Sequence, residues 1–311
     1  MTRQLLKIAQ TVVSLTVYCL RWTPARLEKF FFKAVSRIVH PSIAGRIFKD
    51  AFCSHLKARG IFVEVEYLQT IENVPVKLSL DVADYIQRRF LTDGFPDFMP
   101  MLLRFCDKET VFFDIGANVG IVSLGVATVV PSSQIFAFEP VTKTFGQLEE
   151  NVRRNHPKIN CHHVALSDQV GKVSMLTVAH DSGSASVDHD YLKQRLESNY
   201  IRTNSQTETC QTQRFDTFLS NSKQNVLHLK KKVAIKIDVE GHEIAVLNGM
   251  KLFLDTIRLE ILVICETNWK NLDTVRAKFE NLGFDLLGPS EAILVNGTLY
   301  GSAKDLIFHR R

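Results

Sequence analysis

Short apolar runs alternate with helical stretches along most of this 311-residue chain from about residue 110 onward. Runs that are apolar on both faces are typical of parallel strands, because helices cover both sides of such a sheet. The strand-like runs of the expected core are residues 110–116, 134–140, 159–168, 232–241, 259–267, 284–289 and 305–310. The intervening residues have helical spacing. We therefore expect an α/β fold with a mostly parallel, seven-stranded sheet and helices on both faces.

The first part of the chain has a different pattern. Residues 1–60 have apolar residues at helical spacing, whereas residues 61–68 and 74–80 alternate apolar and polar residues, which predicts a β-hairpin. The expected division is a helical extension over residues 1–60 and a single domain over residues 61–311. Within that domain, the polar stretch 181–211 is expected to be an insertion or a mobile loop.

Composition and charge limit the partners and the location of the protein. The net charge is +5, but no dense run of Lys and Arg is interleaved with aromatic residues, so we expect no nucleic-acid partner. Six isolated cysteines without metal-ligand spacing favour a reduced, cytoplasmic protein. Residues 8–20 carry no charge but are too few to predict a spanning helix. Two alternatives remain for residues 1–21: membrane association, or an amphipathic helix packed on the domain.

The first predicted core strand ends in an acid and a glycine-rich turn. Asp114 is followed by Gly116, Asn118 and Gly120, a spacing of D-x-G-x-N-x-G. Glycine allows a tight turn and a close approach of a ligand to the backbone. An acid at this place repels a pyrophosphate, but it can pair with a cation such as the amino group of S-adenosylmethionine. The alternative interpretation is an ordinary strand-to-helix turn.

The next two strand ends extend this pattern. Glu139 follows the second strand, where a carboxylate can accept hydrogen bonds from both hydroxyls of a ribose. The adenine would then lie at the end of the third strand, near Ser167 and Asp168. Because the carboxyl ends of parallel strands form the ligand site in such sheets, these residues predict a nucleoside pocket.

The end of the fourth strand has the highest density of ionisable residues. Asp238 is expected near the sulfonium or on a metal, and His242 or Glu240 is the candidate general base. The alternative is a structural histidine beside an ordinary helix start. Asp238, Glu266 and Asn268 could form an oxygen-rich divalent site, but three visible ligands are too few to predict a metal.

The motifs VFFDIGANVG, FEP, VALSD and IKIDVEGHE, taken together, resemble the FkbM family of S-adenosylmethionine-dependent methyltransferases. The resemblance covers roughly residues 61–311 and implies a class I, Rossmann-like fold and O-methylation of a sugar or polyketide hydroxyl. It places Glu139 at the ribose and Asp238 in the fourth-strand motif. The residues that match the cofactor loop are Asp114, Gly116, Asn118 and Gly120. Residues 1–60 and 181–211 fall outside the family pattern, and such variable parts are where substrate sites are usually built.

Two rival functions come from other classes. A non-catalytic cofactor-binding or scaffold protein could keep this fold, but the acids at the strand ends argue against it. A nicotinamide-dependent oxidoreductase is disfavoured because the first turn lacks the G-x-G-x-x-G spacing. The expected partner is therefore a small-molecule or glycan hydroxyl acceptor. The sequence does not indicate an oligomeric state.

Overall fold

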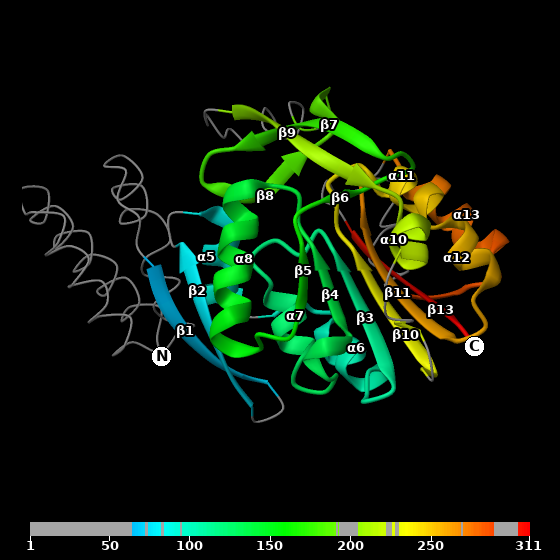
Figure 1. The fold of residues 1–311 in the computed structure, drawn as a ribbon, viewed down its shortest axis with the longest axis horizontal. Coiled ribbons are helices and arrows are strands. Elements are labelled where there is room, and N and C mark those ends of the chain that lie inside the picture. The colour runs from blue at the N-terminus through cyan, green and yellow to red at the C-terminus, as the bar shows by residue number, and fades with distance from the viewer. Residues whose placement is uncertain are drawn as a thin grey trace, which may run out of the picture.

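A seven-stranded sheet forms the centre of the computed structural model (Figure 1). The structure describes residues 64–71, 74–81, 84–93, 95–190, 192, 205–221, 226–227, 230–268, 270–288 and 304–311. The strand order is β12-β13-β11-β10-β3-β4-β5, and only the pairings that involve β13 are antiparallel. The strands are β3 (Thr110–Ile115), β4 (Ile135–Phe138), β5 (Asn160–His162), β10 (Lys232–Ile237), β11 (Glu260–Thr267), β12 (Asp285–Gly288) and β13 (Lys304–Arg310). The predicted fold class is confirmed.

Helices cover both faces of this sheet. The first face carries α6 (Met99–Phe105), α7 (Ile121–Val126) and α8 (Thr142–Asn155). The second carries α10 (Phe215–Asn221), α11 (Glu243–Gly249), α12 (Lys251–Thr256) and α13 (Leu272–Asn281). A short 3-10 turn, η1 (Ser132–Gln134), precedes β4. The period of two along β3 divides the two cores, because Phe112 packs in the first and Phe113 in the second.

One predicted helix is interrupted in the structure. The sequence predicts a continuous helix over residues 242–257, but α11 ends at Gly249 and α12 begins at Lys251. Met250 lies between them with φ −112° and ψ 17°, outside the helical region. The side chain of Met250 is fully buried, so tertiary packing holds this bend in place.

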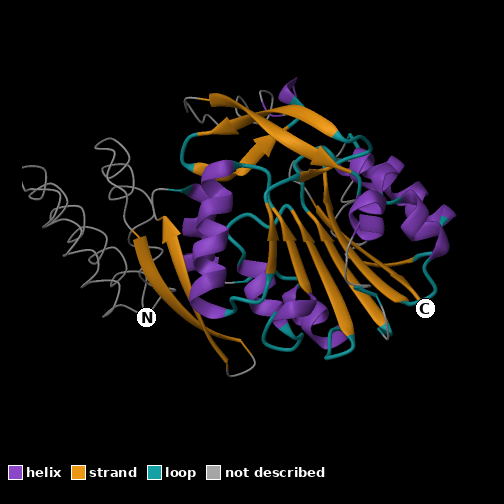
Figure 2. Ribbon diagram, viewed as in Figure 1, coloured by secondary structure: helices purple, strands orange, loops and turns teal. Residues whose placement is uncertain are grey.

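A second sheet lies across the carboxyl ends of the parallel strands (Figure 2). It has the order β6-β9-β7-β8, with β6 (Ala165–Leu166), β7 (Gly171–Val178), β8 (Asp181–Ser186) and β9 (Ser205–Gln213). Two expectations are corrected here. Two parts of the polar stretch 181–211 form the strands β8 and β9, which corrects the mobile-loop alternative and leaves the insertion alternative a prediction. The single strand expected over residues 159–168 is split between the two sheets, as β5 and β6.

The predicted hairpin is present and is fastened to the domain. β1 (Glu64–Ile71) and β2 (Val74–Asp81) pair antiparallel, and α5 (Tyr85–Asp93) follows them. Asn151 of α8 accepts from the backbone N–H of Ser79 at 2.7 Å and donates to the carbonyl of Val119 at 2.9 Å. A buried amide of α8 therefore joins the hairpin to the glycine turn.

The N-terminal predictions lie mostly outside the described residues. This applies to the helical extension over residues 1–60 and to the membrane association of residues 1–21. Among the residues that the structure describes, no helix combines the length and the apolar character needed to cross a bilayer. The domain boundary at residue 60 stays a prediction.

Candidate functional site

The glycine turn after β3 brings two strand ends together. Gly116 has φ +78°, and a Cβ atom at this position would lie 1.8 Å from the carbonyl oxygen of Asp238. The N–H groups of Gly116 and Ala117 both donate to the carbonyl of Phe138, at 2.9 Å each. Asn118 adopts φ +50° and Gly120 adopts φ +88°. Only a residue without a side chain lets the ends of β3 and β10 approach this closely.

Asp114 lies beneath this turn and not on the pocket wall, which corrects its expected direct contact with a ligand. Its side chain is fully buried, and one carboxylate oxygen accepts from both the N–H (3.1 Å) and the hydroxyl (2.7 Å) of Ser123. The reason is the alternation along β3, which directs Asp114 toward α7. Asp114 therefore stabilises the start of the helix that follows the turn.

Lys236 is the buried cation that balances this acid. Its ammonium lies 3.4 Å from Asp114 Oδ1 and 3.3 Å from Asp238 Oδ2, and it donates to the carbonyl of Gly116 at 2.8 Å. Burial alone would lower the pKa of Lys236, but the charges of Asp238 and Asp114 outweigh it and raise that pKa. The side chain of Lys236 thus connects the glycine turn with Asp114 and Asp238.

Glu139 lies at the end of β4 and lines the pocket, as the sequence analysis predicts for a ribose acid. One carboxylate oxygen accepts from the N–H of Asn118 at 3.0 Å and the other from the N–H of Val141 at 2.9 Å. Burial raises the pKa of Glu139 to about 7, against the lowering effect of these two hydrogen bonds. Each oxygen keeps a second lone pair, so the carboxylate can also accept from a ligand.

His242 lines the same pocket from the start of α11. Its Nε2 lies 2.9 Å from the hydroxyl oxygen of Ser167, and that hydroxyl also lies 3.2 Å from Asp168 Oδ1. Burial lowers the pKa of His242, while the charge of Asp168 acts in the opposite direction. Ser167 and Asp168, expected beside an adenine, are not among the residues that line the pocket. Ser167 contacts the candidate base instead, and Asp168 contacts Ser167.

The second sheet forms the roof of this pocket. Met175 of β7 and residues 182–187 of the β8 region face the strand ends from above, and several of them line the pocket. The hydroxyl of Ser182 donates to Asn118 Oδ1 at 3.2 Å, and the hydroxyl of Ser186 donates to the carbonyl of Glu240 at 2.5 Å. The roof is therefore bonded to the two loops that carry predicted site residues.

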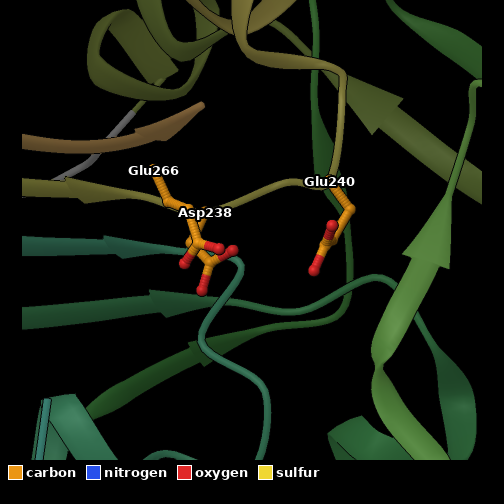
Figure 3. A group of neighbouring side chains, drawn as sticks. All are labelled: Asp238, Glu240 and Glu266. Carbon is orange, nitrogen blue, oxygen red and sulfur yellow. The ribbon is translucent and has the colours of Figure 1, made fainter. Parts of the chain in front are cut away.

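Three carboxylates lie close together (Figure 3), and two of them, Asp238 and Glu240, line the pocket. Oxygen atoms of Asp238, Glu240 and Glu266 lie within 4.8 Å of one another. The charge of Asp238, and then burial, raises the pKa of Glu266 well above its usual value. Glu240 takes the place expected for Asn268, whose side-chain oxygen instead accepts from the N–H groups of Lys270 and Asn271. Lys236 supplies a positive charge to Asp238. A divalent metal at these carboxylates stays an interpretation.

Comparison with known proteins identifies the family. The sequence model described as "Methyltransferase FkbM domain" matches residues 114–286, more than half of the chain. The chain belongs to the FkbM methyltransferase family. The matched segment begins at the buried acid of β3 and contains Glu139, the Asp238 loop and His242, so the pocket lies within the part that the family shares.

Individual relatives of this FkbM chain are distant. It is 25% identical over 217 residues to "Methyltransferase 1" of Beauveria bassiana, a match that covers 68% of this chain and 84% of that protein. It is 28% identical over 174 residues to "Hexuronic acid methyltransferase AglP" of Haloferax volcanii, covering 55% of this chain and 62% of that protein. The crystal structure of Methyltransferase FkbM from Methylobacillus flagellatus matches with a TM-score of 0.39 and 12% identity, covering 72% of this chain and 52% of that one.

Two features at or beside the FkbM pocket were not predicted from the sequence: the contacts of Lys236 and the roof residues of β8. Lys236 shares a strand face with Asp238, and this period-two relation was the available signal for its contact with both acids. The roof residues of β8 had no such signal, because a run of Ser, Gly and Ala has little strand propensity.

Gly116→Ala should damage the site and the fold together. The added Cβ atom meets a backbone carbonyl that cannot rotate away, at a φ that L-residues rarely adopt. We expect the free energy of unfolding to fall by about 2 kcal/mol or more, measured by urea denaturation. Gly146→Ala is the matched control, because no atom lies near its added Cβ atom, and in a helix this change should stabilise by about 0.5–1 kcal/mol. Equal stability of the two variants would contradict the close approach at Gly116.

Proposed function

We propose that this FkbM chain is an S-adenosylmethionine-dependent O-methyltransferase that acts on a hydroxyl of a small molecule or glycan. The observation that carries the proposal is one pocket lined by the turn residue Gly116, the ribose-type acid Glu139 and the base candidate His242. These three residues come from the ends of β3, β4 and β10, the edge at which open parallel sheets bind nucleosides.

The chemistry of the pocket fits this cofactor. Apolar side chains offer a surface for an adenine, Glu139 offers free lone pairs to a ribose diol, and Asp238 and Glu240 place negative charge where a sulfonium and an amino group need it. The missing Cβ of Gly116 leaves room for a close backbone contact. Bound S-adenosylmethionine would supply an electrophilic methyl group.

The residues of the chain would position the acceptor and move its proton. His242 and Glu240 both line the pocket, so either can approach an acceptor hydroxyl. Burial lowers the pKa of His242, so its imidazole is neutral at pH 7 and can accept a proton. The roof strands β7 and β8 would exclude water and contact the acceptor. The name of AglP supports a sugar derivative as one acceptor class.

Affinity for S-adenosylhomocysteine should depend on pH through Glu139. The ionised carboxylate accepts hydrogen bonds from two hydroxyls, and burial raises its pKa to about 7. Protonation below that pH removes acceptor capacity, so we expect Kd to rise by up to about tenfold per pH unit as the pH falls from 7. Isothermal titration calorimetry at several pH values between about 5.5 and 8 measures this change in Kd.

Glu139→Gln is the control for this experiment. The amide keeps the size of the side chain but cannot titrate, so binding should be weaker and its pH dependence should disappear. No heat of binding from folded wild-type protein would overturn the proposed function. A pH dependence that persists in Glu139→Gln would contradict the assignment of Glu139 to the ribose.

A further inference from the structure

The hydrogen bonds around His242 form a short chain that ends on a carboxylate. Among the described residues, the Ser167 hydroxyl is the one hydrogen-bond partner of the His242 ring, at 2.9 Å from Nε2. The same hydroxyl reaches Asp168 Oδ1 at 3.2 Å. These residues are 75 positions apart in the sequence, and β6 contacts α11 where they meet (Figure 1).

Packing holds Ser167 in place. The N–H of Ser167 donates to the carbonyl of Gln213 at 2.9 Å, and the residue is buried. A Cβ atom on Gly249 would lie 1.9 Å from the Ser167 carbonyl oxygen, so α11 passes directly over the backbone of Ser167. Arg214 donates to the Asp168 carbonyl. The serine is therefore fixed from both sides before any ligand binds.

The direction of each hydrogen bond between Asp168, Ser167 and His242 decides which ring nitrogen of His242 carries the proton. The Asp168 carboxylate can only accept, and a hydroxyl that donates to a charged carboxylate makes the stronger hydrogen bond. Once the Ser167 proton points at Asp168, the serine oxygen can only accept from the ring. Nε2 of His242 must then be the protonated nitrogen, and Nδ1 is left with a free lone pair.

We propose that Ser167 and Asp168 are positioning residues that hold His242 in its Nε2–H tautomer, so that Nδ1 is the basic atom of the pocket. This proposal rests on the proposed function. The O–H bond of the acceptor would break and its proton would go to Nδ1. The electron pair left on oxygen would form the new bond to the methyl carbon as the methyl–sulfur bond breaks, and the sulfur would keep that bond's electron pair and leave as the neutral thioether S-adenosylhomocysteine. The charge that develops on the ring is then stabilised through Nε2–H, the serine hydroxyl and the Asp168 carboxylate.

The other acids near His242 have different partners or positions. Glu243, the next residue, accepts from the N–H of Gly241 at 2.7 Å and from Asn271 Nδ2 at 2.7 Å. Asp238 faces Lys236, and Glu139 accepts from the backbone N–H groups of Asn118 and Val141. Glu240 lines the pocket two residues before His242. Asp168, in contrast, is linked to the ring by two hydrogen bonds through the Ser167 hydroxyl.

The tautomer can be measured on the full chain without an acceptor. Two-bond proton–nitrogen correlation spectra distinguish protonated from unprotonated ring nitrogens, and His242→Gln assigns the His242 signals among the 10 histidines. At a pH where the ring is neutral, we expect Nε2 protonated and Nδ1 unprotonated. Ser167→Ala should populate both tautomers, and Asp168→Asn should lower the pKa of His242 because a negative charge that raises it is removed.

A matched control separates this role from general stability. Thr110→Val removes a buried hydroxyl that donates to Asp107 at 3.2 Å, at the opposite end of the sheet. It should leave the His242 spectrum unchanged. A protonated Nδ1 in the wild type, or a His242 spectrum that is the same in Ser167→Ala, would overturn the proposal. The wild type and Ser167→Ala are also titrated with S-adenosylhomocysteine. Absence of binding to the wild type would overturn the proposed function. The tautomer of His242 is measured without this ligand, so the two results are independent.

Discussion

Lys236→Met should be the most destabilising of the substitutions considered for this site. Its ammonium is the cation between Asp114 and Asp238, and Asp114 Oδ1 has no hydrogen-bond donor within the described residues. Removing one partner leaves a buried, uncompensated carboxylate, which costs about 3–5 kcal/mol. The carbonyl of Gly116 also loses its donor. Urea denaturation should show this loss in the free energy of unfolding.

Two further variants test the physical reason. Lys232→Met removes a lysine from the same strand whose ammonium pairs with Asp107 at 3.0 Å nearer to solvent, so the expected loss is at most about 1 kcal/mol. Asp114→Asn combined with Lys236→Met removes the uncompensated charge and should recover part of the stability. Similar losses for the two lysines, or no recovery in the double variant, would show that the buried charge is not the cause.

His242→Ala should abolish most turnover and leave cofactor binding in place. General base catalysis contributes about 10²–10⁴-fold to the rate, so kcat should fall by that factor. Production of S-adenosylhomocysteine, measured with a panel of hydroxyl acceptors, reports the rate. Calorimetry with S-adenosylhomocysteine should give a Kd close to that of the wild type, because Gly116 and Glu139 remain.

His309→Ala is the control for this loss. His309 lies on β13 with its ring 3.0 Å from Glu260, at the amino end of β11 and away from the pocket. It should keep full activity. Wild-type activity in His242→Ala would show that another group, such as Glu240, accepts the proton. The rate of the wild type should also fall at acid pH, where the imidazole becomes protonated and can no longer act as a base.

The strand-end side of the pocket was largely predictable from the sequence. The acids and glycines at strand ends are local signals, and the topology of a parallel sheet brings strand ends to one edge. Gly116, Asn118, Glu139, Asp238, Glu240 and His242 all line the pocket, as a shared edge requires. Asp114 differs because an acid at a strand end can face either a ligand or the covering helix. Which face of β3 packs against α7 decides whether Asp114 faces a ligand or the helix. The sequence alone does not indicate this packing.

The roof of the pocket was much less predictable. Residues 181–211 have a polar composition that is typical of a loop, yet β8 and β9 both pair with β7, and residues of β8 line the pocket. Strand pairing satisfies backbone hydrogen bonds whatever the side chains are, so composition is a weak guide where a sheet edge is available. Ser167 and Asp168 were placed at a predicted adenine because they end a strand-like run, but that run changes sheets at residues 163–164.

The sequence by itself determined the fold class, the hairpin, the FkbM resemblance and the line of strand-end residues, because periodicity, glycine positions and strand-end acids act over short distances along the chain. The tertiary structure decided what the side chains touch. Lys236 reaches Asp114 across 122 positions (236 − 114 = 122), and Ser167 reaches His242 across 75. Such contacts depend on strand register and on the close packing that Gly116 and Gly249 permit. Local sequence patterns do not indicate strand register or this close packing.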